Sequence, residues 1–299
     1  MCEERMRALD LVKLTPLMML TDGSPDIVIG LIDGPVAIGH SDLVGVTLHQ
    51  PGGRAEGECT RAGSAACQHG TFVAGILFAK RNSAAPAICP ACTLLVRPIF
   101  TETTATTGRI PSATPEELAK CIIDCVNAGA HVLNISAAVV QSSSRSNTAL
   151  EQALDKAASR GTLVVVAAGN QGTLGSTAVT SHPWVIPVSA YDLQGRPMLQ
   201  SNFGVSIGRH GLGAPGEQIT CLSLADKPLR FGGTSAAAPF VTGAVALLWS
   251  KYPNASAAQI KLSITQSHPG QRRSVIPPLL DAWRAYQSLL LMQSRGSVL

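Results

Sequence analysis

Three side chains in this sequence have the types that nucleophilic acyl transfer requires: Asp33, His69 and Ser235. A serine hydroxyl becomes a nucleophile only when a base removes its proton, and a neutral imidazole is that base near neutral pH. A carboxylate beside the imidazole fixes its tautomer and stabilises the imidazolium. Each residue alone is more often structural, as an Asp-Gly turn, a buried histidine or an N-cap serine. Together they follow the order Asp, His, Ser, which is a known order of a serine catalytic triad, and they predict that chemistry.

A fourth side chain, Asn170, suits the same reaction. It follows the run VVVAAG at positions 164–169, an apolar stretch that ends in small residues. An amide N–H at such a place can donate to the oxyanion of a tetrahedral intermediate. Ser235 precedes an apolar helix, where the backbone N–H groups and the helix dipole favour negative charge. We therefore expect Asn170 and the start of this helix to stabilise the oxyanion.

The elements that must position these residues alternate between strands and helices along the chain. Thr114 and Glu117 have the spacing of a capping box, and Gly129 ends the helix that they begin. The alternation predicts an α/β fold, with a mostly parallel central sheet and helices on both faces. Asp33 then follows the first strand, at the sheet edge where such folds place their sites. The expected strands are 26–32, 93–99, 132–136, 163–168 and 185–189, and the expected helices are 70–79, 115–127, 147–159 and 239–251.

Composition excludes several classes of protein. The chain is 45% hydrophobic and 14% charged over 299 residues, which is too apolar for a disordered protein. Its net charge of +4 is scattered, and no run of Lys and Arg predicts binding to nucleic acid. The longest apolar stretches fall well short of the roughly 20 residues that span a bilayer. The N-terminus mixes acids and bases and lacks the pattern of a signal peptide, so we expect a cytoplasmic protein without membrane or nucleic-acid partners.

The eight cysteines are many for a cytoplasmic protein. Cys59 and Cys67 flank a Gly/Ala-rich loop and could form a disulfide. Cys89 and Cys92 have the spacing of a zinc half-site or a redox pair, but no second pair completes a zinc site, so no metal ligands are assigned. If residues 67–69 are extended, Cys67 points away from His69, and we expect no cysteine to take part in catalysis.

Four motifs in the sequence resemble those of the subtilisin-like serine proteases. They are LIDGPV, QHGTFVAGIL, AAGN and GGTSAAAPFVTGAVALL, and the resemblance covers residues 26–252. It implies a subtilisin-like α/β fold, a peptide substrate and serine endopeptidase activity. It also implies that Asp33, His69 and Ser235 are the acid, base and nucleophile, and that Asn170 forms the oxyanion hole.

The resemblance extends to residues that contact the substrate. Segment 133–136 is similar to the strand on which this family pairs its peptide, which implies that Ser136 and the following Ala137 and Ala138 line the substrate, together with Gly169 of the AAGN motif. The family usually has glycines after that serine. The Cβ atoms of the alanines are therefore expected either to narrow the pocket for the residue before the cleaved bond or to block a neighbouring pocket.

One branch of the family is most similar to this chain. The segments GLIDGPVAIGHSDL and LLVRPIF resemble the cyanobactin-type maturation proteases, which act on ribosomally made precursor peptides and have no pro-segment. Ring-closing members carry a helical insertion between the Asp and His motifs, and the short interval here favours hydrolysis. A transpeptidase (macrocyclase) of the same family and a general intracellular subtilase remain alternatives.

More distant alternatives fit the residues less well. A non-catalytic binding protein is expected to lose one of the four motifs, and an esterase of the α/β-hydrolase fold needs a G-x-S-x-G motif that this chain lacks. A zinc or redox protein built on Cys89 and Cys92 is the most distant alternative. No cofactor is expected; family members often bind structural calcium, but no acidic cluster assigns a site. We divide the chain into an N-terminal extension (1–25) and a peptidase domain (26–299) with a C-terminal helix from about 278, and leave the oligomeric state open.

Overall fold

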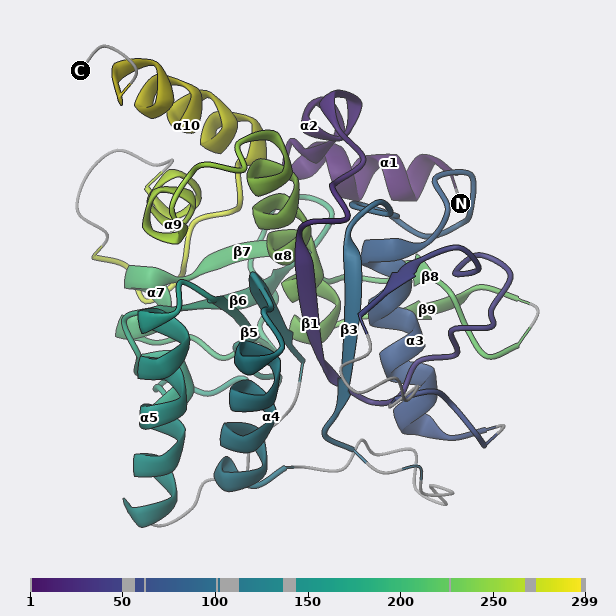
Figure 1. Ribbon diagram of the computed structural model, residues 1–299, viewed down its shortest axis with the longest axis horizontal. Coiled ribbons are helices and arrows are strands. Elements are labelled where there is room, and N and C mark those ends of the chain that lie inside the picture. Colours follow the sequence, from purple (N-terminus) through teal and green to yellow (C-terminus); the bar gives the residue numbers. More distant parts are fainter. Residues whose placement is uncertain are drawn as a thin grey trace.

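A parallel sheet with helices on both faces forms the centre of the computed structural model, as predicted (Figure 1). The structure describes residues 2–49, 57–61, 63–100, 102, 113–136, 144–225, 227–266 and 273–296. All neighbouring strands in this seven-stranded sheet are parallel. In their order across the sheet, the strands are β2 (Thr47–Leu48), β3 (Thr93–Pro98), β1 (Val28–Asp33), β4 (Val132–Ile135), β5 (Leu163–Ala167), β6 (Val185–Tyr191) and β7 (Leu212–Pro215).

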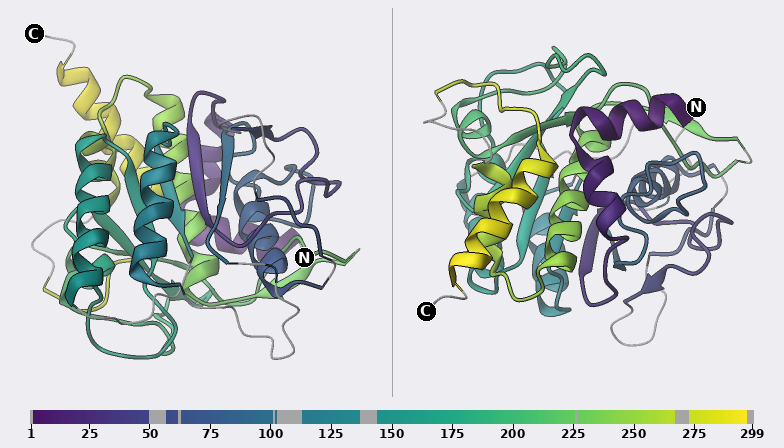
Figure 2. Two further views of the ribbon diagram at one scale, coloured as in Figure 1. Left: turned by 60° about the horizontal axis from the view of Figure 1, so that its bottom comes forward. Right: turned by 90° about the horizontal axis from the view of Figure 1, so that it is seen from above.

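Two apolar cores, one on each face, explain why the strands are apolar runs. In β5, Leu163 and Val165 belong to one core, whereas Val164 and Val166 belong to the other. Because both faces are buried, no position on the strand favours a polar side chain. Helices α3 (Ala65–Phe78) and α8 (Thr234–Lys251) pack in the first core, and α4 (Pro115–Asn127) and α5 (Ser144–Ser159) lie side by side over the second (Figure 2).

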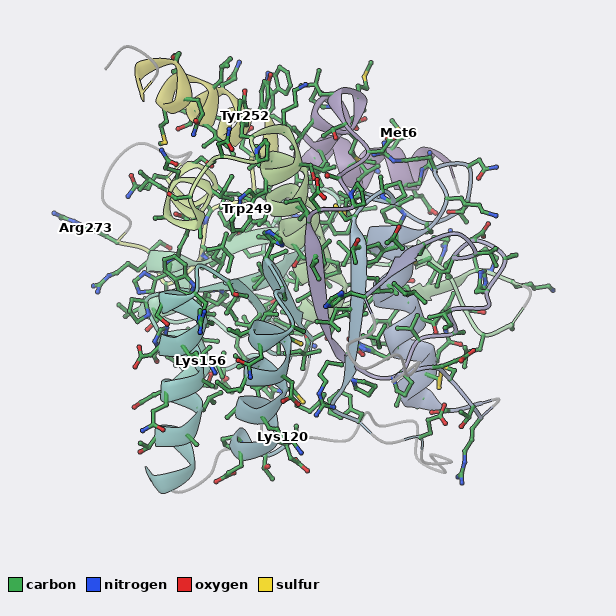
Figure 3. The ribbon with its side chains drawn as sticks, viewed as in Figure 1. Met6, Lys120, Lys156, Trp249, Tyr252 and Arg273 are labelled. Carbon is green, nitrogen blue, oxygen red and sulfur yellow. A yellow bond between two sulfur atoms is a disulfide. The ribbon has the colours of Figure 1, made fainter. Side chains whose placement is uncertain are left out.

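Helices with one exposed face and helices buried on all sides differ in how many polar residues they contain. In α4, Leu118 and Ile122 are buried while Lys120 is exposed (Figure 3). The predicted capping box at the start of α4 is present. Helix α8 is buried almost throughout, as far as Trp249 near its C-terminal end, which explains its apolar sequence.

Three helices begin earlier than predicted, and one of them is α5, which starts at Ser144 and not at 147. Helix α3 starts at Ala65 because the Ser64 hydroxyl accepts a hydrogen bond from Cys67 N (3.3 Å), so His69 lies inside the helix and not before it. Helix α8 starts at Thr234, five residues before Pro239. Pro239 lies inside α8 near its N-terminal end, and it does not mark the start of the helix.

The N-terminal segment contributes to the core, which the sequence did not reveal. Leu9, Val12 and Leu17 are buried in the same core as α8. Among the described residues, no helix is both long and apolar enough to cross a membrane. The C-terminal helix begins at Ala282, slightly later than expected. The elements not yet named are α1 (Cys2–Leu11), α2 (Leu14–Leu20), α6 (Ala178–Ser181), α7 (Val205–His210), α9 (Ala257–Thr265), α10 (Ala282–Gly296) and the antiparallel hairpin of β8 (Ile219–Cys221) and β9 (Leu229–Phe231).

Candidate active site

The predicted acid and base meet at the carboxyl end of β1. Asp33 is the last residue of this strand, and its Oδ1 lies 2.6 Å from His69 Nδ1. The same oxygen accepts a hydrogen bond from Gly34 N at 2.6 Å, and both side chains are buried. A carboxylate only accepts, so Nδ1 of the neutral imidazole carries the proton and Nε2 keeps its lone pair. His69 Nε2 is buried and has no hydrogen-bond partner among the described residues.

Two glycines allow β1 and α3 to approach this closely. A Cβ added at Gly70 would lie 2.4 Å from Gly34 O, and one added at Gly34 would lie 2.0 Å from Ala66 O. Both distances are far below van der Waals contact, and both neighbours are backbone atoms that cannot rotate away. The Gly after Asp33 and the Gly after His69 therefore permit the hydrogen bond between those two side chains.

The predicted nucleophile is the second residue of α8. Ser235 Oγ lies 3.4 Å from Ser136 O, at the end of β4, and the side chain is largely buried. A buried network joins the two elements beneath it. Thr242 Oγ1 donates to Asn134 Oδ1 (2.8 Å), and Asn134 Nδ2 donates to Ser136 Oγ (3.0 Å). This network fixes the start of α8 against the strand that is predicted to pair with the substrate.

The amide of Asn170 is held in one orientation. Its Oδ1 accepts hydrogen bonds from Thr234 N (2.9 Å) and Thr234 Oγ1 (3.2 Å), and Gly169 N donates to the same hydroxyl (3.2 Å). Nδ2 is therefore the group left to donate to a ligand. Gly233 has φ +95°, and a Cβ there would lie 2.8 Å from Asn170 Oδ1, so this position requires glycine.

Phe231 of β9 is a contact of His69 that the sequence did not predict. The two rings meet edge to face, with centroids 5.4 Å apart and planes at 87°. Thr234, Asn134 and Thr242 were missed as well. For Thr234, the only signal in the sequence is its place beside Ser235, whereas the other contacts come from strands and helices that are distant in sequence.

A cavity of about 440 Å³ lies beside the candidate oxyanion hole. Its lining includes Gly169, Thr173, Leu174, Thr177 and Thr180, and none of its lining residues is charged. Of the predicted substrate contacts, Gly169 lines this cavity, whereas Ser136 lies beside Ser235, whose Oγ is 3.4 Å from Ser136 O. The predictions for Ala137 and Ala138 concern residues outside the described part of the chain.

The cysteines lie apart from these groups. Cys59 and Cys67 form a disulfide, the pairing that their flanking positions suggested. The premise that residues 67–69 are extended was wrong, because they lie in α3. The described thiols that remain free are all buried, and burial raises the pKa of Cys89, Cys125 and Cys221. A raised pKa suppresses the reactive thiolate of these three residues, whereas a hydrogen bond with Cys89 lowers the pKa of Cys92.

The described residues contain one cluster of charged or sulfur-containing side chains that could hold a metal ion, and its atoms are not those that calcium prefers. Calcium takes six to eight oxygen ligands. The one described cluster of three potential metal ligands contains two sulfur atoms and a single carboxylate.

Comparison with known proteins gives consistent matches. The chain matches the model of the Subtilase family over residues 24–280. It is 31% identical over 249 residues to subtilisin DY of Bacillus licheniformis, which covers 81% of this chain and 84% of that protein. A thermostable alkaline protease of Halalkalibacterium halodurans is 32% identical over 200 residues, 67% of this chain. This chain covers 52% of that protease, or about half its length.

Solved structures extend the comparison to the whole fold. The prenylagaramide maturation protease PagA has a TM-score of 0.76 and 29% identity, covering 92% of this chain and 98% of that chain. The patellamide maturation protease PatA has a TM-score of 0.73 and 31% identity, covering 90% and 98%. The PatG macrocyclase has a TM-score of 0.76 at 21% identity, covering 92% and 95%, and shows the shared fold alone.

Proposed function

Because this chain belongs to the subtilase family of serine proteases, we propose that it is an endopeptidase that cleaves ribosomally made precursor peptides during natural-product maturation. The observation that carries the catalytic part is the bond between Asp33 and His69, which places the lone pair of the neutral ring on Nε2. The precursor-peptide part rests on likeness to PagA and PatA, two maturation proteases that align over at least 90% of this chain.

In the proposed reaction, His69 Nε2 takes the proton of Ser235 Oγ as that oxygen attacks the carbonyl carbon of the peptide bond. Asp33 holds the Nδ1–H and stabilises the imidazolium. The imidazolium then gives its proton to the leaving amine, and an ester to Ser235 remains. Water attacks this ester with His69 again as the base, which releases the acid and restores the serine.

Negative charge on the carbonyl oxygen needs donors that are already in place. Asn170 Nδ2 is one candidate, because Thr234 occupies the other end of the amide. The start of α8 is the second, because its first N–H groups and dipole favour an anion. Donors held this way cost no reorganisation when the charge forms.

The uncharged cavity beside Gly169 indicates the side chain that precedes the cleaved bond. Its volume of about 440 Å³ and its threonine and aliphatic lining suit an uncharged residue, because a buried charge would find no counter-ion there. A cytoplasmic location is part of this proposal, because a ribosomally made peptide is available in that compartment.

Hydrolysis is proposed in preference to ring closure. Between β1 and α3, the described residues contain the short strand β2 and no helix, so nothing described there covers the acyl-enzyme from water. Mass spectrometry of a precursor-like peptide should then show linear fragments. A dominant product that lacks one water would contradict hydrolysis.

Labelling with a fluorophosphonate tests the nucleophile. We expect the label on Ser235, and we expect Ser235→Ala to abolish both labelling and peptide cleavage in a folded protein. Ser159→Ala is the matched control, because this exposed serine ends α5 and bonds only to Lys156 O. Full labelling of the Ser235→Ala variant would rule out the assignment.

A further inference from the structure

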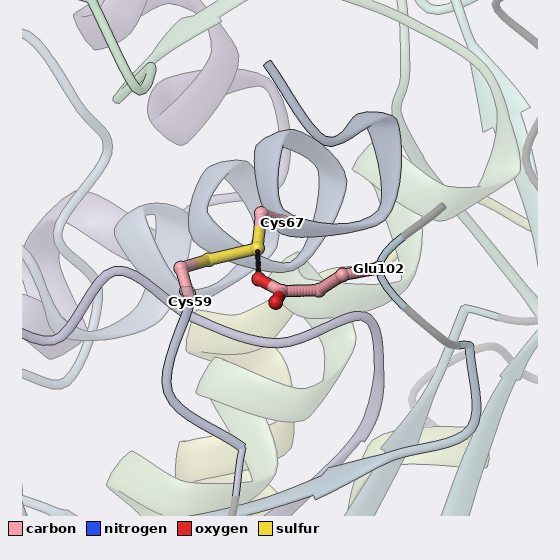
Figure 4. A group of neighbouring side chains, drawn as sticks. All are labelled: Cys59, Cys67 and Glu102. Atoms are coloured by element: carbon pink, nitrogen blue, oxygen red, sulfur yellow. Dashed lines mark hydrogen bonds between the residues drawn. A yellow bond between two sulfur atoms is a disulfide. The ribbon is translucent and has the colours of Figure 1, made fainter. Parts of the chain in front are cut away.

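Cys59, Cys67 and Glu102 form a cluster where a loop meets the start of α3 (Figure 4). The two sulfur atoms and a carboxylate oxygen lie within 4.8 Å of one another. Within the described residues, this is the one group of three side chains of metal-binding type that converge in this way. The three come from separate segments: the loop 57–61, the helix α3 and the chain beyond β3.

The carboxylate of Glu102 is aimed at the sulfur atoms by its other partners. Its Oε1 accepts hydrogen bonds from Thr60 N (2.7 Å) and Arg61 N (3.3 Å), and Oε2 accepts one from the Thr60 hydroxyl. Oε1 also lies 2.5 Å from Cys67 Sγ. A disulfide sulfur carries no proton, so Cys67 can donate a hydrogen bond to this oxygen only as a thiol, in the reduced protein.

The disulfide that joins Cys59 and Cys67 is suited to an oxidising environment. Cytoplasmic thiol systems keep such pairs reduced. A dithiol reductant gives two electrons and two protons to the S–S bond, so Cys59 and Cys67 become thiols while the reductant becomes a disulfide. The reduced protein would then have two thiols and one carboxylate facing one another.

We propose that the reduced protein binds one zinc ion through Cys59, Cys67 and Glu102, with water as the fourth ligand. Thiolate and carboxylate are common zinc ligands, and the binding releases the two thiol protons. The two cysteine Cα atoms are 5.7 Å apart, which allows both thiolates to reach an ion at about 2.3 Å after side-chain rotation. Cys59 and Glu102 are partly exposed and give the ion access.

The position of the cluster indicates what the zinc ion would do. The loop pairs with the chain just after Asp33, through Val36 N to Gly57 O (2.7 Å) and Cys59 N to Val36 O (3.1 Å). Cys67 belongs to the helix that carries His69. Residues two apart on a helix project to nearly opposite sides, so the zinc ion lies away from the imidazole. Zinc in the reduced protein, like the disulfide in the oxidised one, would tie this loop to α3.

Zinc binding by the same chain in two redox states tests the proposal without any substitution. Wild-type protein is reduced with a phosphine, desalted without oxygen and titrated with zinc chloride against a chromophoric chelator. We expect one zinc ion per reduced chain and none per oxidised chain. Zinc should also raise the Tm of the reduced protein only. Absence of zinc binding by the reduced chain would overturn the proposal.

Three variants then locate the ion. Cys59→Ser should bind no zinc, and Glu102→Gln should bind it at least about 10-fold more weakly. Cys92→Ser is the matched control, because Cys89 and Cys92 are the other closely spaced pair, both fully buried, and it should still bind one equivalent. With cobalt as the probe, thiolate charge-transfer bands should vanish in Cys59→Ser alone. Loss of zinc in Cys92→Ser, or unchanged binding in Cys59→Ser, would refute the site, and circular dichroism confirms that each variant is folded.

Discussion

Two histidines at opposite ends of strand β1 have opposite hydrogen-bonding roles. At the carboxyl end of β1, Asp33 accepts a hydrogen bond from His69 Nδ1. At the other end of β1, Val28 N donates to His131 Nδ1 (3.2 Å). The His131 ring also meets the ring of Trp249, near the end of α8, edge to face with centroids 5.4 Å apart.

The two regions differ in the hydrogen-bond partner of Nδ1, and this partner determines which ring nitrogen of the histidine carries the proton and which can act as a base. A carboxylate on Nδ1 requires a proton there and leaves Nε2 of His69 as a base. A backbone N–H on Nδ1 requires a lone pair there, so the neutral ring of His131 carries its proton on Nε2. We therefore expect His69 to serve catalysis and His131 to serve stability.

Replacing each histidine with alanine tests this division of roles most directly. His69→Ala should lower kcat by about 10⁶-fold, because the serine loses its base, and should leave the fold intact. His131→Ala should leave kcat nearly unchanged and should lower Tm, because Val28 N loses a partly buried acceptor. Kinetics and thermal unfolding of the two variants measure both effects. A large loss of kcat in a folded His131→Ala protein would contradict the division of roles.

The next largest effect concerns the oxyanion. Asn170→Ala should lower kcat by about 100- to 1000-fold with KM little changed, because the donated bond forms only in the transition state. Steady-state kinetics on a peptide ester and a peptide amide measures this effect. A change in KM alone would instead assign Asn170 to binding of the substrate ground state.

The sequence predicted the candidate catalytic residues better than the residues that hold them in place. The inner strands were predicted because strands buried on both faces are apolar runs, whereas β2 and β7 were missed because one has two residues and the other reads LGAP. The start of α3 was missed because Gly70 and His69 weaken the helical pattern that Ser64 caps. Candidate site residues could be chosen by motif. The partners that orient them, such as Thr234, depend on tertiary contacts that no local pattern contains.

A smaller effect tests one of those partners. Thr234→Val keeps the shape of the side chain but removes the hydroxyl that bonds to Asn170 Oδ1 and Gly169 N. We expect kcat to fall by about 3- to 10-fold, the equivalent of one net hydrogen bond, with KM unchanged. In the double variant with Asn170→Ala, Thr234→Val should have no further effect on kcat. Full additivity would show that Thr234 does not act through Asn170.

The smallest effect concerns pH and the structural histidine. Burial lowers the pKa of His131, and Asp26 opposes this effect only partly. Protonation of Nδ1 would also break the bond from Val28 N. In the unfolded chain His131 takes up its proton near its ordinary pKa of about 6.5. Just below that pH the unfolded state therefore binds more protons than the folded state, and stability falls as pH falls.

Comparison with a variant that cannot titrate isolates this contribution from all other groups. His131→Leu should have a lower Tm than wild type at pH 8, because Val28 N loses its acceptor, but the difference should shrink as pH falls from about 7 to about 5. Tm measured across this range for both proteins gives the difference directly. A difference that stays constant would mean that His131 keeps the same pKa in both states. The hydrogen bond from Val28 N would then leave the pKa of His131 in the folded protein equal to that of an exposed histidine.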